Sequence, residues 1–237
     1  TVLARRFRSF EIVACASRNP ARAQAFAEKY GIVAVSVEEA LSGAHGIEAI
    51  LNLTPPASHF AVSMAALENG LHVYSEKPIA ASLAEGRQLA SRASAGKVRL
   101  GGAPDTFLGA ALQRARRLID DGRIGEVVFG HANFISGGME HRHPNPEFFF
   151  KPGGGPALDI GPYYVTALVC LLGPVASVCA SGRVGRPVRT ITAPESPHKG
   201  STITVDVFTT IQAQLLFASG ATLMMTLSWD GWESSLP

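Results

Sequence analysis

Short apolar runs alternate with amphipathic segments along the first hundred residues of the chain. The runs are rich in β-branched residues and lack polar alternation, which is typical of strands buried on both faces of a parallel sheet. They span residues 11–16, 33–35, 47–53, 71–73 and 98–100. The alternation predicts an α/β fold, with a Rossmann-type parallel sheet over residues 1–103.

Helix signals lie between these runs. Asn19 is expected to cap a helix that ends at Gly31, and Ser58 to cap a helix over residues 59–69. Capping boxes are expected at Ser36 with Glu39 and at Ser82 with Glu85, the second before a helix that ends near Gly96. Each helix therefore connects two successive strands, as parallel pairing requires.

The pattern changes after residue 103. Helices are predicted at residues 107–121 and 158–172, and strands at residues 126–135, 210–217 and 221–229. The last two strands flank Ser219 and Gly220, a typical antiparallel hairpin turn. Residues 137–155 form a loop too long for a simple connector. We expect an α+β domain with a mainly antiparallel sheet over residues 104–237, serving substrate binding and oligomerisation.

Composition restricts the kind of protein. Hydrophobic residues make up 46% and charged residues 17% of the 237 residues, as in a globular protein. The net charge of +2 gives no basic surface for nucleic acid, and no apolar run reaches the roughly 18 residues of a membrane span. Cys15, Cys170 and Cys179 have no metal-type spacing and indicate a reduced compartment. We expect a cytoplasmic protein without nucleic-acid, membrane or metal partners.

Both ends of the chain look incomplete. It begins with Thr1 instead of methionine, and residues 1–10 read as part of a basic helix. No Gly-x-Gly-x-x-Gly sequence precedes the first predicted strand. We expect the chain to be part of a longer polypeptide.

Three motifs lie where buried strands or the long loop end. They are Thr-Pro-Pro-Ala-Ser-His at residues 54–59, Tyr-Ser-Glu-Lys-Pro at residues 74–78 and Gly-Gly-Gly-Pro-Ala-Leu-Asp-Ile-Gly-Pro-Tyr at residues 153–163. In this order they resemble the Gfo/Idh/MocA family of nicotinamide-dependent oxidoreductases, which act mostly on sugars and cyclitols. The resemblance implies a first strand and a glycine-rich turn before residue 1, and further strands after residue 237.

Cofactor contacts are expected at the carboxyl ends of the strands, where open α/β sheets bind ligands. An acidic residue after the second strand of the Rossmann order favours NAD, whereas Arg18 with Ser17 suits the 2′-phosphate of NADP. NADP is therefore preferred over NAD, unless Asn19 is only a helix cap and Arg18 a solvated charge. The expected cofactor-binding residues are Ser17, Arg18, Asn19, Asn52, Thr54, Pro55, Pro56, His59, Glu76 and Lys77.

Lys77, Asp159 and Tyr163 are the candidate catalytic residues. An ammonium at Lys77 would bind the reacting hydroxyl and stabilise the developing oxyanion, and the resemblance implies a catalytic lysine in this Glu-Lys-Pro motif. Asp159 and Tyr163 are four residues apart and would share a helix face. Tyr163 would move the proton, with Lys77 stabilising its phenolate.

Structural explanations for the same residues stay open. Lys77 could pair with Glu76, Asp159 could balance a helix dipole, and Tyr163 could pack in the core beside Tyr164. The family usually has a histidine at the position of Tyr163. A tyrosine there resembles the glucose–fructose oxidoreductase and dimeric dihydrodiol dehydrogenase branches.

His141 and His143 lie in the long loop and are expected to bind substrate together with Asp159 and Tyr163. A metal site is not expected, because no cysteine or carboxylate cluster completes a ligand set. The three phenylalanines at residues 148–150 are expected to pack within the protein rather than stack on a sugar.

Together with these residues, the resemblance implies an oxidoreductase that transfers a hydride between nicotinamide and a hydroxyl or keto carbon of a sugar, cyclitol or related polyol. Two alternatives stay open: a non-catalytic protein of the same fold that senses a sugar or dinucleotide, and a relative that cleaves glycosides with tightly held NAD. An open face of the second sheet would be buried in a homodimer or homotetramer.

Overall fold

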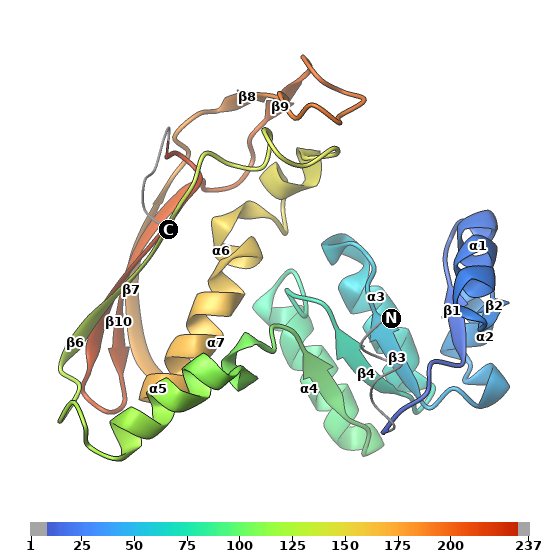
Figure 1. The fold of residues 1–237 in the computed structure, drawn as a ribbon, viewed down its shortest axis with the longest axis horizontal. Coiled ribbons are helices and arrows are strands. Elements are labelled where there is room, and N and C mark those ends of the chain that lie inside the picture. Colours follow the sequence, from blue (N-terminus) through green and yellow to red (C-terminus); the bar gives the residue numbers. More distant parts are fainter. Residues whose placement is uncertain (1–8, 232–237) are drawn as a thin grey trace. The chain divides into compact units, whose positions relative to one another are not determined.

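Short parallel strands organise the first part of the molecule (Figure 1). The computed structural model describes residues 9–231, and the chain divides into two units, Thr1–Ala103 and Pro104–Pro237. In the first unit, β1 (Ala14–Ala16) pairs with β2 (Val33–Val35), and a second sheet contains β3 (Ala49–Asn52), β4 (His72–Ser75) and β5 (Leu100–Gly102). All pairs are parallel, which confirms the predicted Rossmann-type arrangement.

The helices of this unit begin at the predicted signals with one exception. They are α1 (Pro20–Tyr30), α2 (Val37–Leu41), α3 (Pro56–Glu68) and α4 (Leu83–Gly96), with a 3₁₀ turn at Ala44–Gly46. The Asn19 cap and both capping boxes are confirmed. The predicted Ser58 cap is wrong, because Pro56 already forms the first turn of α3 and the Ser58 N–H donates to the Pro55 carbonyl.

α3 and α4 pack together over the β3–β4–β5 sheet. The buried cluster consists of Ala66, Leu67, Leu71, Val73, Ala80, Leu89 and Ala93. Leu67 and Leu89 are 0% exposed, and each contributes about 1.5–3 kcal/mol through burial. This cluster anchors the strand ends from which the turns after β3 and β4 emerge.

Longer strands form the sheet of the second unit. In spatial order they are β6 (Phe129–Ile135), β11 (Thr222–Ser228), β10 (Thr210–Phe217) and β7 (Val175–Arg183). β10 is antiparallel to both β11 and β7, whereas β6 is parallel to β11, so the sheet is mainly antiparallel, as predicted. The hairpin turn is confirmed, with Gly220 at φ 92°. A separate antiparallel pair contains β8 (Val188–Thr190) and β9 (Thr202–Thr204).

Helices cover one face of this sheet. They are α5 (Ala110–Asp120), α6 (Gly155–Asp159) and α7 (Gly161–Leu172), with 3₁₀ turns at Thr106–Leu108 and Glu147–Phe150. Figure 1 shows α5 and α7 on the same side of the sheet. Tyr164 and Leu168 of α7 pack against the cluster that contains Leu215 and Leu223 of the strands. The sheet therefore has one buried face and one open face within the described residues.

Two predicted helices are interrupted. The segment 107–121 is a 3₁₀ turn followed by α5, because Gly109 between them is extended, with ψ 149°. The segment 158–172 is divided at Ile160, because Pro162 lacks the N–H that a continuous helix would use. The predicted basic helix over residues 1–10 lies mostly outside the described residues, and residues 9 and 10 are not helical.

Cys15, Cys170 and Cys179 are free thiols. Burial raises the pKa of the Cys15 thiol above its usual range, so it stays protonated at neutral pH. Across residues 9–231, no helix has the length and apolar character needed to cross a membrane. Over the same residues, no three side chains of His, Cys, Asp or Glu gather into a group that could hold a metal ion.

Candidate active site

The carboxyl ends of β1, β3 and β4 carry the expected cofactor-binding residues of the first unit. Residues 17–19 follow β1, residues 54–59 follow β3, and residues 76–78 follow β4. Parallel strands end at one edge of their sheet, which is where open α/β sheets bind ligands. The segments after β3 and β4 are adjacent, since the Glu76 N–H donates to the Asn52 carbonyl at 2.9 Å.

Local hydrogen bonds hold the turn after β1. The Asn19 N–H donates to Ser17 Oγ at 3.2 Å, and Asn19 Oδ1 accepts from the Arg22 N–H at 3.2 Å. The side chain of Arg18, between them, is exposed. Asn19 is thus engaged as the cap of α1, and Arg18 presents its charge to solvent.

Asn52 is a buried centre of hydrogen bonds at the end of β3, with 1% of its surface exposed. Its Nδ2 donates to the His59 carbonyl at 3.1 Å and to Ser63 Oγ at 3.0 Å. Its Oδ1 accepts from the Thr54 N–H at 3.2 Å and from the Thr54 hydroxyl at 2.7 Å. The Asn52 amide therefore fixes the turn into α3 from inside the unit.

His59 lies inside the same unit and is also 1% exposed. Its Nδ1 is 2.6 Å from the Pro78 carbonyl oxygen, and its Nε2 is 2.7 Å from the Thr54 carbonyl oxygen. The ring thus links the turn after β3 to the turn after β4. Because its side chain is enclosed, its influence on a ligand passes through these two turns.

Lys77 is half-buried in the turn after β4, beside the exposed Glu76. The Glu76 carboxylate accepts a hydrogen bond from the Lys77 backbone N–H at 2.9 Å, and the Lys77–Pro78 peptide bond is cis. Ser75, at the end of β4, is 0% exposed, and its carbonyl accepts from the Ala103 N–H at 2.9 Å. A partly exposed ammonium on a backbone held this way is suited to orienting a ligand oxygen.

Asp159 and Tyr163 lie on either side of the break between α6 and α7. Both side chains are half-buried. Ile160 keeps right-handed helical angles (φ −103°, ψ −35°), and the Tyr163 N–H donates to its carbonyl at 3.1 Å, so the helical direction continues across the break. Tyr164 is a core residue: its ring packs edge-on against Phe134, and its hydroxyl donates to a carbonyl of β6 at 3.3 Å.

The glycine run before α6 has a steric cause. A Cβ atom on Gly154 would lie 2.4 Å from the Phe149 carbonyl oxygen, and Gly155 has φ 81°. Gly154 excludes larger residues because the loop returns closely over its own backbone, and Gly155 excludes them because its positive φ is strained for a residue with a Cβ atom. This requirement explains part of the third motif without a ligand.

His141 is held by two side chains. Its Nδ1 lies 2.5 Å from Thr192 Oγ1, and its Nε2 lies 3.5 Å from Glu140 Oε1. About half of its side chain remains exposed. The exposed part of the ring is therefore fixed in direction, as a substrate-binding residue requires.

His143 is held by the backbone and by aromatic rings. Its Nδ1 accepts from the Asn145 N–H at 3.0 Å, so the proton of the neutral ring is on Nε2. Its ring packs edge-on against Phe148 and Phe149. Phe150 is 0% exposed, which confirms the packing interpretation for this phenylalanine.

A buried ion network, which local sequence patterns do not indicate, anchors the loop that carries His141. The Arg189 side chain is 0% exposed and donates to Glu140 Oε1 at 2.7 Å and to Asp230 Oδ1 at 2.6 Å. It also donates to the carbonyls of Gly137 and Trp229. Glu140 and Arg189 are 49 positions apart, so only the folded structure reveals the pair.

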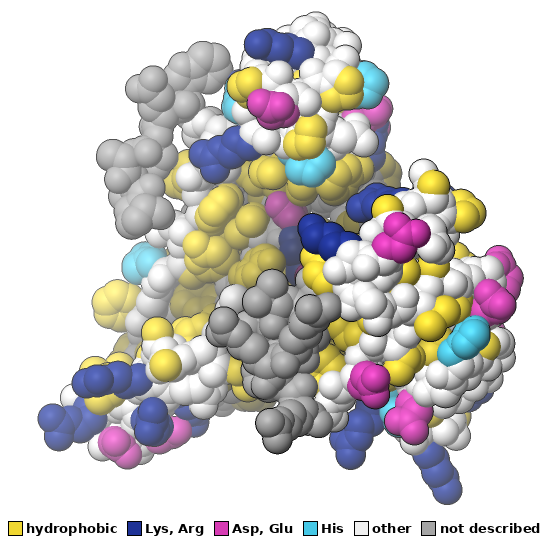
Figure 2. Space-filling view, turned by 45° about the vertical axis from the view of Figure 1, so that its right-hand side comes forward, with side chains coloured by type: hydrophobic (Ala, Val, Ile, Leu, Met, Phe, Trp, Pro, Cys, Tyr) yellow, Lys and Arg dark blue, Asp and Glu magenta, His cyan; other side chains and the backbone are white. Residues whose placement is uncertain are grey.

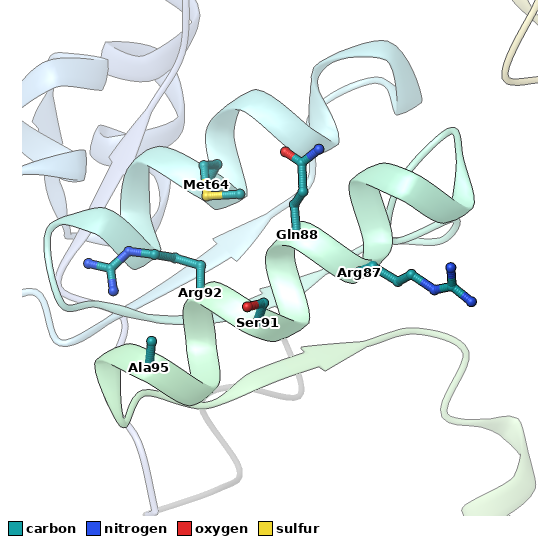
Figure 3. Close-up of a pocket in the computed structure, with 6 residues that line it drawn as sticks. All are labelled: Met64, Arg87, Gln88, Ser91, Arg92 and Ala95. Carbon is teal, nitrogen blue, oxygen red and sulfur yellow. The ribbon is translucent and has the colours of Figure 1, made fainter.

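A shallow pocket of about 470 Å³ lies on α3 and α4, and none of its lining residues is an expected site residue (Figure 3). Its lining consists of Met64, Arg87, Gln88, Ser91, Arg92 and Ala95. Figure 3 shows Arg87 and Arg92 pointing in opposite directions, and Arg92 donates to the Glu68 carbonyl at 3.2 Å. The two charges therefore do not converge on a ligand.

Charged side chains are dispersed over the face of the molecule in Figure 2. Lys and Arg side chains are interspersed with Asp and Glu on this face and do not gather in one patch.

Residues 1–102 match the oxidoreductase family with an NAD-binding Rossmann fold, and residues 112–235 match the GFO/IDH/MocA C-terminal domain. Over 188 residues the chain is 35% identical to dTDP-3,4-didehydro-2,6-dideoxy-α-D-glucose 3-reductase of Streptomyces antibioticus, covering 75% of this chain and 53% of the relative. Over 230 residues it is 29% identical to D-xylose 1-dehydrogenase (NADP⁺) 2 of Haloferax volcanii. That match covers 94% of this chain and 63% of the relative.

A solved structure of similar fold is the NAD binding oxidoreductase from Klebsiella pneumoniae. It superposes with a TM-score of 0.81 at 24% identity and covers 94% of this chain. This chain spans 59% of that structure, and it likewise spans little more than half of the first curated relative above. The similarity to the solved structure supports the shared fold.

Proposed function

The chain belongs to the Gfo/Idh/MocA family, and from that membership we propose that it transfers a hydride between a nicotinamide dinucleotide and a hydroxyl or keto carbon of a sugar, cyclitol or related polyol. The observation that carries the proposal is the half-buried Lys77 at the carboxyl end of β4, on a turn braced by His59 and adjacent to the turn after β3. The relatives named for a sugar-nucleotide reductase and a xylose dehydrogenase support this substrate class.

The donor set of the first unit fits a nicotinamide dinucleotide. Arg18 offers an exposed guanidinium at the end of β1, Pro55 is exposed in the rigid turn after β3, and Lys77 offers an ammonium after β4. We propose that the cofactor is held by Ser17, Arg18, Asn19, Asn52, Thr54, Pro55, Pro56, His59, Glu76 and Lys77, with Asn52 and His59 acting from inside. When bound, the nicotinamide supplies or accepts the hydride.

The chain's own residues bind the substrate and move its proton. Lys77 binds the reacting oxygen and stabilises negative charge on it. Tyr163 accepts the hydroxyl proton during oxidation and donates it during reduction, and Asp159 orients the substrate. His141 and His143 contact further hydroxyl groups. A spectrophotometric assay of NADP⁺ reduction across a panel of sugars and cyclitols tests the function; binding of NADPH without turnover on any member would favour the sensing alternative.

Replacing Arg18 by alanine should weaken NADPH binding by about 10–100-fold and leave NADH binding within about threefold. The expectation follows from the loss of a charge-assisted hydrogen bond to the 2′-phosphate, which NADH lacks. Titration of full-length protein followed by nicotinamide fluorescence measures both affinities. Arg22 lies on α1 and is exposed like Arg18. Arg22→Ala is therefore the matched control and should change neither affinity. Equal weakening of both cofactors would refute the phosphate site.

We propose a homodimer or homotetramer formed through the open face of the second sheet. No helix within residues 9–231 covers this face (Figure 1). In the register of β6 with β11, Phe129 pairs with Thr222, and His131 pairs with Met224 two residues further along. Phe129 is 72% exposed and Met224 44% exposed, so a second copy would bury substantial apolar surface.

Replacing Met224 by aspartate should weaken self-association by at least about tenfold. A carboxylate in the middle of this face would lose its hydration in the oligomer, while in the monomer it would stay hydrated. Sedimentation velocity over a concentration series measures the change. Lys199→Asp introduces the same group at an exposed position outside the sheet and is the control. An unchanged sedimentation profile for Met224→Asp would place the interface elsewhere.

We propose that the protein works in a reducing compartment such as the cytoplasm. Cys15, Cys170 and Cys179 are all free thiols, and oxidising compartments favour disulfides. Cys179 is exposed, so it is the thiol most open to oxidation outside such a compartment.

A further inference from the structure

The three consecutive phenylalanines of the 3₁₀ turn Glu147–Phe150 differ in how deeply they lie. Phe150 is 0% exposed and Phe149 is half-buried, whereas Phe148 is 41% exposed. The rings of Phe149 and Phe150 both pack edge-on against Trp229, at centroid distances of 6.0 Å and 5.5 Å. Packing within the protein therefore accounts for Phe149 and Phe150 but not for the exposed ring of Phe148.

Phe148 presents one face of its ring outward. Its centroid lies 4.0 Å from that of Phe149, and the two ring planes differ by 30°, so the two rings are stacked. The His143 ring lies 5.5 Å from Phe148 and 5.2 Å from Phe149. A side chain over the outward face of Phe148 would be farther from Phe149 than from Phe148, so His143 lies beside the stacked pair. The exposed surface of Phe148 is therefore mainly the face opposite Phe149.

Backbone hydrogen bonds hold this ring in place. The Phe149 N–H donates to the Pro146 carbonyl at 3.1 Å, and the Asp206 N–H donates to the Phe150 carbonyl at 2.9 Å. The residues on either side of this position are therefore fixed, and stacking on Phe149 fixes the ring of Phe148 itself. An aromatic side chain that is ordered before a ligand arrives loses little conformational entropy on binding.

The turn that carries Phe148 adjoins residues that are expected to bind substrate. The turn contacts α6, the helix that ends at Asp159, and the Phe148 ring contacts His143 edge-on. All three residues belong to the second unit. Ligand sites commonly combine an apolar or aromatic surface with a few polar groups that fix orientation. Phe148 supplies the aromatic surface here, and His143 and Asp159 supply the polar groups.

A saturated ring of a sugar or cyclitol is complementary to such a surface. Its equatorial hydroxyl groups project around the rim, and its axial C–H groups form an apolar face. These hydrogens carry a small positive charge, and the face of an aromatic ring is negative. An open-chain polyol has no comparable face, because its hydroxyl groups point in several directions around the chain.

We propose that Phe148 is a specificity-determining residue that stacks on the C–H face of the substrate ring. The site then favours pyranoses and cyclitols over open-chain polyols. Stacking holds the ring by one face and leaves the hydroxyl groups at its rim to polar side chains such as His143. The role in turnover rests on the proposed function, whereas the binding of a ring to Phe148 does not.

Binding of myo-inositol and D-glucitol to full-length protein tests the stacking without turnover. Both compounds have the same numbers of carbon atoms and hydroxyl groups, but only myo-inositol is a ring. In saturation-transfer nuclear magnetic resonance, Phe148→Leu should reduce the myo-inositol C–H signals at least about fivefold, because leucine keeps apolar bulk without an aromatic face. Phe148→Tyr should retain these signals, and those of D-glucitol should change in neither variant. Equal myo-inositol signals in wild type and Phe148→Leu would overturn the proposal.

Kinetics with a cyclic substrate of the wild-type protein test the role in specificity. Phe148→Leu should raise KM about tenfold and keep kcat within about threefold, because stacking stabilises the bound substrate and the transition state alike. Phe26 on α1 is the matched control, since it is 39% exposed and its ring lies 4.5 Å from that of Tyr30. Phe26→Leu should leave KM unchanged.

A lower melting temperature of Phe148→Leu with unchanged KM would make Phe148 a packing residue and overturn the proposal. An equal rise of KM for cyclic and open-chain substrates would also overturn it, because the ring would then not be the feature selected. If the wild-type protein transfers no hydride to any sugar, the proposed function fails. The comparison of myo-inositol with D-glucitol still decides whether Phe148 binds a ring.

Discussion

Replacing Arg189 by methionine should lower the free energy of unfolding of the second unit by about 3–5 kcal/mol. The guanidinium is 0% exposed and bonds both Glu140, which is 1% exposed, and Asp230. Without it, the enclosed Glu140 carboxylate loses its shortest ion pair and keeps only the longer ones, with Arg186 at 3.7 Å and with His141 at 3.5 Å. Methionine fills space of similar length but cannot compensate a buried charge. The loss should therefore exceed that of an ordinary surface substitution.

Urea unfolding followed by tryptophan fluorescence measures this loss. Both tryptophans, Trp229 and Trp232, belong to the second unit, and Trp229 is 1% exposed. Arg123→Met, an exposed arginine of the same unit, should stay within about 0.5 kcal/mol of wild type. Combining Arg189→Met with Glu140→Gln should recover part of the loss, because the uncompensated charge is then gone. A loss below about 1 kcal/mol in the single variant would show that water or rearrangement replaces the pair.

Sequence signals predicted the parts of the fold that depend on neighbouring residues. A capping hydrogen bond joins residues three positions apart, so the caps at Asn19, Ser36 and Ser82 could be identified from local sequence and are confirmed. Ser58 failed because two prolines upstream already start the helix. The break at Ile160 was missed because Pro162 is tolerated in a first helical turn and does not mark its boundary from sequence alone.

The side chains of the candidate site were harder to place than its backbone. The motif at residues 54–59 correctly indicated the end of a buried strand. It did not indicate that Asn52 and His59 turn inward, because that direction is decided by contacts with Ser63 and Pro78 on other elements. The Arg189 network depends on residues brought together by β8 and the end of β11, and such pairs leave no periodic signal. The cofactor contacts of Asn52 and His59 stay predictions.

Replacing Lys77 by methionine should lower kcat for hydride transfer by about 10²–10³-fold. The ammonium is expected to stabilise negative charge on the reacting oxygen, and methionine keeps the length of the side chain without that charge. Because Lys77 is half-buried on a turn held by Ser75 and His59, the backbone should keep its place in the variant. NADPH affinity should therefore change much less than kcat.

Stopped-flow measurement of nicotinamide absorbance with a sugar turned over by the wild-type protein gives the hydride-transfer rate directly. Lys29 is exposed on α1 and is far in sequence from the turn after β4. Lys29→Met removes the same charge there and should keep the wild-type rate. Tyr163→Phe offers an independent comparison, since loss of the proton-transfer group should slow the same step by about 10²–10⁴-fold. If Lys77→Met retained turnover within a few-fold while Tyr163→Phe did not, the oxyanion would be stabilised by another group. The lysine of the Glu-Lys-Pro turn would then serve cofactor binding alone.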